Sequence, residues 1–264
     1  MVLWLDGSRE IIPDEDFAMT FVPQILYEDN HLLLVVKPAG ILSQEDISGD
    51  PDMLSLLKKD IAIRYHKPGN VFLGLIHRLD RPVSGVMVFA KTGKAASRLS
   101  AQVREGRFDK RYRAVVVGTP TKSEDELVHY LSKDHETNVT TVYAVTDTAP
   151  KDAKLARLRY RKLGEYSGGA EAMSLLEVEL LTGRSHQIRA QLSYMGCPII
   201  GDNKYGAKEM FRSGKKADIA LEAYQLSFDH PVSKERLTFS LPLPSALPWS
   251  LFGNGENNIL GEGG

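Results

Sequence analysis

The sequence predicts an α+β fold in which helices pack against a mixed, mainly antiparallel central sheet. Strand-like and helix-like segments alternate irregularly, without the regular β–α repeat of a doubly wound parallel sheet. Several expected strands also alternate apolar and polar residues, as strands with one exposed face do. We therefore expect antiparallel pairs to dominate the sheet.

Apolar runs between turn-forming residues predict the strands. A continuous apolar run indicates a buried strand at residues 31–36, and further strands are expected at 86–90, 112–117 and 237–241. Residues 173–181 alternate apolar residues with Glu177 and Glu179, which predicts a half-exposed strand.

Three segments carry the apolar spacing of amphipathic helices. Each follows a residue that can cap a helix: Asp50 before 51–64, Thr92 before 93–105 and Ser185 before 186–195. Gly106 and Gly196 follow the second and third of these segments, and glycine commonly ends a helix.

The composition is that of a globular protein without a membrane span, and we expect it to be cytoplasmic. No apolar run approaches the roughly 18 residues that cross a bilayer. The first 17 residues hold five acids and one arginine, the wrong charge for a signal peptide. The single cysteine, Cys197, fits a reducing compartment.

Basic residues gather in three segments, although the net charge is −1. These are residues 104–113, 151–162 and 204–216. They could form one basic face that binds nucleic acid, or several unrelated solvated faces, and charge alone favours the second interpretation.

The densest polar cluster lies between Gly74 and Thr92, where His77, Arg78, Asp80 and Arg81 fall within five residues. A polar loop that leads into a buried strand can hold a reactive group rigidly. An ionised Asp80 could act as nucleophile, general base or metal ligand. It could equally form a structural ion pair with one of the flanking arginines.

Two further segments could bind an anion or a base. Arg184 precedes a helix on which His186 and Arg189 share a face, although a merely solvated face would have the same spacing. Tyr112 stands between cations in KRYR, where it could stack on a nucleobase or pack in the core. The sequence contains no P-loop, Rossmann glycine fingerprint, HExxH or CxxC motif.

Taken together, these segments resemble the RluA family of pseudouridine synthases. Its HRLDxxTSG motif stands as His77–Gly85, with Ala90-Lys91 after the strand, and its GRxHQIR motif stands as Gly183–Arg189. The stretches at 25–40, 197–206 and 230–244 are also similar to family sequence. Two positions depart from the pattern: Val83 stands where threonine is usual, and Gln191 stands where histidine is frequent.

The resemblance implies a pseudouridine synthase fold with a catalytic cleft, and isomerisation of uridine in ribosomal or transfer RNA without a cofactor or metal. It implies Asp80 as nucleophile, Tyr112 beside the target base and Arg189 paired with Asp80. It also implies a set of substrate-binding residues: His77, Arg78, Arg81, Arg184, His186 and Gln187. Arg78 would help fill the gap left by the flipped nucleotide, and segments 104–113 and 204–216 would contact the RNA backbone.

We expect residues 1–24 to form an irregular leader, 25–250 the catalytic domain and 251–264 a flexible tail, as in the short type without an N-terminal RNA-binding domain. A monomer is favoured. The main alternative is a non-catalytic RNA-binding or ribosome-assembly protein that retains the fold. A glycoside hydrolase would need a second acid opposite Asp80, and the motif region holds none.

Overall fold

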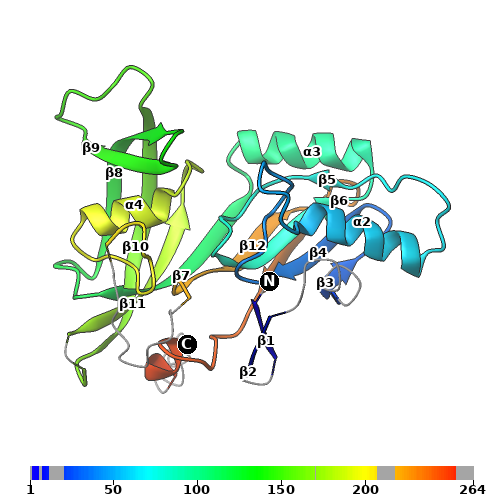
Figure 1. Cartoon of the computed structure of the whole chain (residues 1–264). Coiled ribbons are helices and arrows are strands. Elements are labelled where there is room, and N and C mark those ends of the chain that lie inside the picture. Colours follow the sequence, from blue (N-terminus) through cyan, green and yellow to red (C-terminus); the bar gives the residue numbers. More distant parts are fainter. Residues whose placement is uncertain (1, 6–7, 12–20, 170, 207–217, 254–264) are drawn as a thin grey trace, which may run out of the picture. The chain divides into compact units, whose positions relative to one another are not determined.

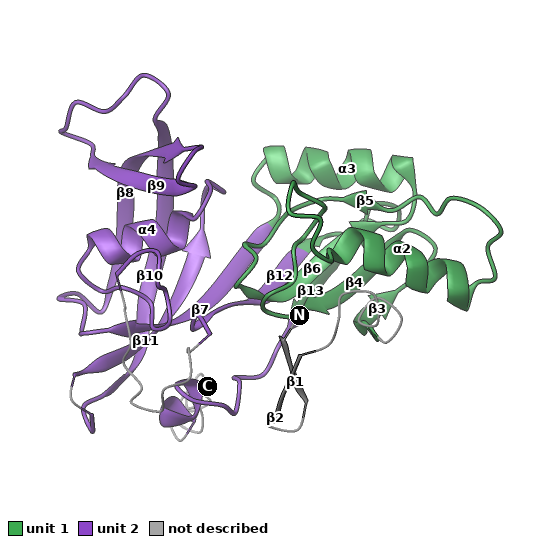
Figure 2. Cartoon of the chain, viewed as in Figure 1, with its two compact units in different colours: residues 1–108, 228–239 green, residues 109–227, 240–264 purple. Residues whose placement is uncertain are grey.

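A computed structural model describes residues 2–5, 8–11, 21–169, 171–206 and 218–253. The chain divides into two compact units (Figure 2). Unit 1 comprises residues 1–108 and 228–239, and unit 2 comprises residues 109–227 and 240–264. Within these described ranges, no helix is long and apolar enough to cross a membrane.

The sheet of unit 1 is built on antiparallel strands (Figure 1). They are β3 (Gln24–Glu28), β4 (Leu32–Lys37) and β6 (Ser84–Ala90), in that order, and β5 (Gly74–Leu75) also pairs with β6. Both central strands are continuous apolar runs, so their side chains are buried on both faces. The strands predicted at 31–36 and 86–90 are confirmed.

The helices of unit 1 lie along these strands (Figure 1). They are α2 (Met53–Arg64) and α3 (Gly93–Arg104). The cap predicted for α3 is confirmed, since Thr92 Oγ1 accepts a hydrogen bond from the amide of Ala95 at 3.2 Å. The cap predicted for α2 is wrong. Asp52, not Asp50, accepts a bond from the amide of Ser55 at 3.0 Å, because only this carboxylate stands three residues before that amide.

The segment expected to be an irregular leader contains a two-stranded antiparallel hairpin. Its strands are β1 (Val2–Leu5) and β2 (Ser8–Ile11). All four residues of Val2–Leu5 are apolar, a run too short to predict a strand from the sequence. Residues 254–264, most of the predicted tail, lie outside the described residues.

The sheet of unit 2 is also antiparallel throughout. Its order is β12 (Leu221–Asp229), β7 (Asp109–Val117), β11 (Met173–Leu180), β10 (Lys154–Tyr166), β8 (Glu124–Asp134) and β9 (Val139–Ala144). The helix α4 (Gln187–Tyr194) packs against β8 and β9. The predicted α+β class with a mainly antiparallel sheet is therefore confirmed.

Three expectations about unit 2 need correction. Strand β11 is largely buried rather than half-exposed, because β7 and β10 flank it and their side chains cover its outer residues. Helix α4 has His186, not Ser185, at its cap position, in a left-handed conformation with φ 51° and no capping bond. The strands β8, β9 and β10 were not predicted at all.

The remaining elements are short. Strand β13 (Arg236–Ser240) matches the strand predicted at 237–241, and the 3-10 helix η1 (Trp249–Phe252) follows it. Both Trp249 and Phe252 of η1 are buried, so the ordered chain continues past the predicted domain end at residue 250.

Candidate active site

The polar loop with Asp80 connects β5 to β6 in unit 1. Two of its apolar residues, Leu79 and Val83, are buried, whereas Asp80 between them is half-buried. The amide of Val83 donates a hydrogen bond to the carbonyl of Asp80 at 3.0 Å, which closes a tight turn. The buried residues therefore anchor the loop on both sides of a carboxylate that keeps access to solvent.

Ser43 fixes the backbone one residue before Asp80. Its hydroxyl donates to the carbonyl of Leu79 at 2.7 Å and accepts from the amide of Leu79 at 3.0 Å. Ser43 is itself buried, so both polar groups of Leu79 are satisfied away from water. A segment nearly forty residues earlier in the chain thus sets the position of the loop that contains Asp80.

Lys37 fixes the backbone one residue after Asp80. Its side chain is 0% exposed, and its ammonium group donates to the carbonyls of Pro38 at 2.9 Å and Arg81 at 3.0 Å. Burial lowers the pKa of Lys37 to about 7, while attraction to the Asp80 carboxylate acts in the opposite direction. The buried Lys37 side chain is therefore held beside the loop that contains Asp80 by two backbone carbonyls.

Arg81 stabilises the neighbouring loop. Its Nε atom donates to the carbonyl of Gly40 at 3.0 Å, and its guanidinium forms an exposed ion pair with Asp50 at 2.5 Å. Arg81 therefore takes part in a structural ion pair with Asp50. The prediction that Arg81 binds substrate stays a prediction.

His77 supports the strand that follows the loop. Its Nε2 atom accepts a hydrogen bond from the amide of Val88 at 3.2 Å, and its ring packs edge-on against Phe108. Accepting this bond requires Nε2 to be unprotonated. Arg78, next in the chain, is exposed and available to a ligand.

In unit 2, Tyr112 lies in the middle of β7, paired in register with Val178 of β11. Only 6% of Tyr112 is exposed, so it contributes to the core whatever else it does. Lys110, two residues earlier, lies on the same strand face. Burial lowers the pKa of Lys110, because a less hydrated site disfavours its charged form.

Arg189 is held by an acid that the sequence did not reveal as its partner. Asp202 binds its guanidinium through two hydrogen bonds of 2.8 Å, to Nε and Nη2. Both residues are buried, with 6% of Arg189 and 1% of Asp202 exposed. Such a two-point pair fixes the plane of the guanidinium.

A second layer surrounds this pair. The Arg189 guanidinium lies 5.2 Å from the ring centre of Tyr205, whose hydroxyl contacts Nδ1 of His186 at 2.8 Å. The amides of Lys204 and Tyr205 also donate to Asp202. The turn at 202–205 therefore orients the side chains of Arg189 and His186.

The remaining predicted substrate contacts lie before and at the start of α4. The side-chain oxygen Oε1 of Gln187 accepts hydrogen bonds from Thr182 Oγ1 and from the backbone amide of Arg184. Its Nε2 atom donates to the carbonyl of Arg157 at 3.0 Å. Arg184 is exposed and donates to the carbonyl of Leu155. These bonds shape the loop, and substrate contact by Arg184, His186 and Gln187 stays a prediction.

The basic segment 151–162 does not form a free cationic surface. Its arginines on β10 pair with acids on the neighbouring strands: Arg157 and Arg159 with Glu126, and Arg161 with Glu177. This favours the interpretation of a solvated, charge-balanced face for that segment. Of the basic segment 204–216, only residues 204–206 are described.

Comparison with known proteins identifies the family. Residues 31–194 match the family model for RNA pseudouridylate synthases. The chain is 34% identical to ribosomal large subunit pseudouridine synthase D of Pseudomonas aeruginosa, over 94% of this chain and 77% of that protein. It is 33% identical to ribosomal large subunit pseudouridine synthase C of Vibrio cholerae, over 86% and 68%. The chain belongs to the RluA family of RNA pseudouridine synthases.

Further relatives agree with this assignment. An uncharacterised RNA pseudouridine synthase of Helicobacter pylori is 33% identical over 83% of this chain and 66% of its own length. The solved structure of human RNA pseudouridylate synthase domain containing 4 matches with a TM-score of 0.69, at 23% identity over 84% of this chain and 88% of that chain. At that identity the structural match establishes the pseudouridine synthase fold alone.

The motif residues of this family lie in two different compact units of the chain. Asp80 and its supports Lys37 and Ser43 belong to unit 1, whereas Tyr112 and Arg189 belong to unit 2. Sequence reasoning found the motif residues but missed Lys37, Ser43, Asp202 and Tyr205. The KPAG and GDNKYG stretches that contain three of them resemble family sequence, which was the available signal. Among the described residues, no group of three or more His, Cys, Asp or Glu could hold a metal.

Proposed function

We propose that this chain converts uridine to pseudouridine in ribosomal RNA, with Asp80 as the nucleophile. The observation that carries the proposal is the HRLD loop, in which a half-buried carboxylate lies between two backbone positions fixed by Lys37 and Ser43. Relatives named for the large ribosomal subunit support ribosomal RNA as substrate. An enzyme acting on that RNA would work in the cytoplasm.

The reaction breaks the N1–C1′ bond of uridine, turns the uracil and joins C5 to C1′. The C5 proton moves to N1, so the atoms of substrate and product balance and no electrons enter or leave. In the proposed mechanism the Asp80 carboxylate attacks the nucleoside, while Lys37 holds the loop backbone beside it. A carboxylate held in place by its backbone needs little reorganisation before attack.

Arg189 and Tyr112 complete the proposed catalytic set. A guanidinium that Asp202 already orients could pair with the Asp80 carboxylate when RNA is bound. Tyr112 would stack on the uracil, and its hydroxyl could help to remove the C5 proton. The uridine must leave its stack to reach these groups, at a cost of a few kcal/mol.

The decisive variant is Asp80→Asn, which removes the negative charge and preserves the shape. We expect it to bind RNA with unchanged affinity and to form no pseudouridine, measured by release of tritium from RNA labelled at uridine C5. Asp218→Asn is the matched control, since Asp218 is exposed. Appreciable turnover by Asp80→Asn would remove Asp80 from its role.

The substrate is tested separately, by mapping pseudouridine in total cellular RNA with and without the gene. We expect the loss of a site in large-subunit RNA. Loss of a transfer RNA site alone would correct the proposed substrate, and an unchanged map would favour a non-catalytic RNA-binding protein.

A further inference from the structure

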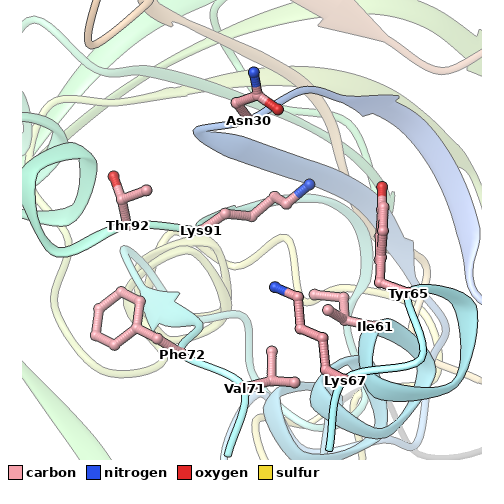
Figure 3. Close-up of a pocket in the computed structure, with 8 residues that line it drawn as sticks. All are labelled: Asn30, Ile61, Tyr65, Lys67, Val71, Phe72, Lys91 and Thr92. Carbon is pink, nitrogen blue, oxygen red and sulfur yellow. The ribbon is translucent and has the colours of Figure 1, made fainter.

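Unit 1 contains a pocket of about 340 Å³ between the end of α2 and the start of α3, which we call the α2–α3 pocket (Figure 3). Its volume is in the range of sites for small ligands. The lining residues are Asn30, Ile61, Tyr65, Lys67, Val71, Phe72, Lys91 and Thr92. None of them belongs to the catalytic loop.

Two ammonium groups converge on this pocket. The Nζ atoms of Lys67 and Lys91 lie 5.8 Å and 5.1 Å from the ring centre of Tyr65. Figure 3 shows both side chains reaching into the space between the lining residues. An anion bound in the pocket would be attracted by both ammonium groups.

The backbone end of α2 fixes the position of Lys67. His66 adopts a left-handed conformation with φ 49°, and its amide bonds to the carbonyl of Ile63 at 3.2 Å. The amide of Lys67 bonds to the carbonyl of Ala62 at 3.0 Å. This pair of bonds is the Schellman arrangement, which ends a helix in one defined direction.

Lys91 is fixed through its side chain. Its Nζ atom donates to Glu28 at 2.7 Å and to the carbonyl of Asp29 at 2.6 Å. Glu28 therefore offsets part of its charge and that of Arg64, which also pairs with Glu28. Lys67 has no acidic partner among the described residues, so the pocket keeps an uncompensated positive charge.

The start of α3 adds to this positive character. Thr92 caps the helix at the rim of the pocket, and the first turn of α3 contains no acidic residue. Helix N-termini carry a partial positive charge that favours anions. Lys94, in the same turn, is exposed.

Two exposed aromatic side chains lie beside these cations. Phe72 is 54% exposed and Tyr65 is 49% exposed, so each ring offers apolar surface that the fold does not bury. Cations next to exposed rings are the combination with which proteins bind single-stranded nucleic acid, because phosphates meet the cations and bases stack on the rings.

The α2–α3 pocket lies at the opposite end of β6 from the catalytic loop. Asp80 precedes this seven-residue strand, and Lys91 and Thr92 follow it. At about 3.3 Å for each residue, the strand separates the two places by roughly 20 Å. A ligand in the pocket would therefore not occupy the reaction site.

We propose that the α2–α3 pocket binds one nucleotide of the substrate RNA outside the segment that is modified. Lys67 and Lys91 hold its phosphate, and Phe72 stacks on its base. This inference rests on the proposed function only in taking RNA as the substrate.

The test compares RNA binding by the full chain and by two variants, Lys67→Ala and Phe72→Ala, with a uridine dodecamer as probe. Both side chains are exposed, so neither change should disturb folding, which circular dichroism checks. Phe72→Ala should weaken binding about tenfold, the scale of one stacked base. Lys67→Ala should lower the slope of log affinity against log salt by about 0.7, the value for one contact to a single strand.

Matched controls lie on α2, outside the pocket: Lys59→Ala removes another exposed cation, and Ile63→Ala another exposed apolar side chain. Both should bind as the wild-type chain does. Equal effects of Lys59→Ala and Lys67→Ala would show diffuse charge attraction and overturn the site. Equally tight binding of uridine monophosphate or inorganic phosphate would show a small-molecule site, and absent binding of the dodecamer would also overturn the proposal.

Failure of this site and failure of the proposed function give different results. If the site is wrong, the wild-type chain still forms pseudouridine and the two variants bind RNA like their controls. If the function is wrong, the wild-type chain forms no pseudouridine, whatever the binding data show.

Discussion

The ammonium group of Lys37 donates a 3.0 Å hydrogen bond to the carbonyl oxygen of Arg81, the residue after Asp80. The same oxygen accepts the amide of Gly40 at 2.8 Å. A fully buried lysine is costly unless its donors are used, and Lys37 uses them to hold the loop that contains Asp80.

Lys37→Met should keep the apolar stem and lose the ammonium group. We expect turnover to fall at least tenfold with little change in RNA affinity, because the loop loses a fixed point beside Asp80. Single-turnover kinetics and RNA binding measure the two effects. Lys58→Met, on α2, is the control. Unchanged turnover in Lys37→Met would show that Gly40 and Ser43 suffice to hold the loop.

Tyr112→Phe and Tyr112→Ala separate stacking from hydroxyl chemistry. Tyr112→Phe should remain stable and bind RNA but lose turnover, whereas Tyr112→Ala should also lose roughly 3–5 kcal/mol of stability, because the side chain is buried. Urea unfolding and turnover assays check both. Equal activity of the wild-type chain and Tyr112→Phe would leave Tyr112 with a structural role only.

Asp202→Ala should leave the Arg189 guanidinium buried without its carboxylate. Removing one partner of a buried ion pair costs roughly 3–5 kcal/mol. We expect the free energy of unfolding to fall by this amount, with a smaller loss in a double variant, Asp202→Ala with Arg189→Met. Additive losses in the urea unfolding of these variants would contradict the coupling. Arg189→Lys should keep only part of the wild-type turnover, since lysine lacks the two-point fork of arginine.

Glu222 predicts a pH dependence of stability. It lies opposite Arg113 in the β12–β7 register, and its Oε2 atom has no hydrogen-bond partner in the described part of the chain. Burial raises the pKa of Glu222 to about 7, and the charge of Arg113 only partly opposes this. The folded chain therefore binds more protons than the unfolded chain between about pH 4.5 and 7.

The contribution of Glu222 to the free energy of unfolding is therefore complete below about pH 4.5 and is lost as the pH rises through about 7. Glu222→Gln should remove this loss and be more stable than the wild-type chain at pH 8, by roughly 1–3 kcal/mol. Thermal unfolding from pH 5 to pH 8 measures the difference, with Glu45→Gln as an exposed control. Parallel curves for the wild-type chain and Glu222→Gln would contradict the prediction.

Local patterns predicted the elements whose signals are complete within a short segment. The cap at Thr92 and the stop at Gly106 define α3, and both belong to its own sequence. In strand β10 basic residues alternate with Ala156, Leu158 and Tyr160. The density of charge favoured a solvated segment, so the strand was not predicted. Its partners on β8 and β11 make it a strand, and they come from distant sequence.

In the candidate site, too, local signals could be predicted from the sequence and distant pairings could not. Asp80 could be predicted because its charged neighbours stand beside it in sequence. Lys37 lies 44 residues before the carbonyl that it binds, and Asp202 lies 13 residues after Arg189 beyond the end of a helix. Neither pairing has a sequence signal of its own, since each depends on how strands and turns bring distant residues together.

The division of the chain also constrains how unit 1 can form during synthesis. Residues 228–239 complete it, with Phe228 stacked on Phe108 and His230 bonded to Asp29. A ribosome must therefore translate most of the polypeptide before the hydrophobic centre of unit 1 is complete. A fragment that stops at Phe108 should expose apolar surface and precipitate, even though it contains the whole HRLD motif.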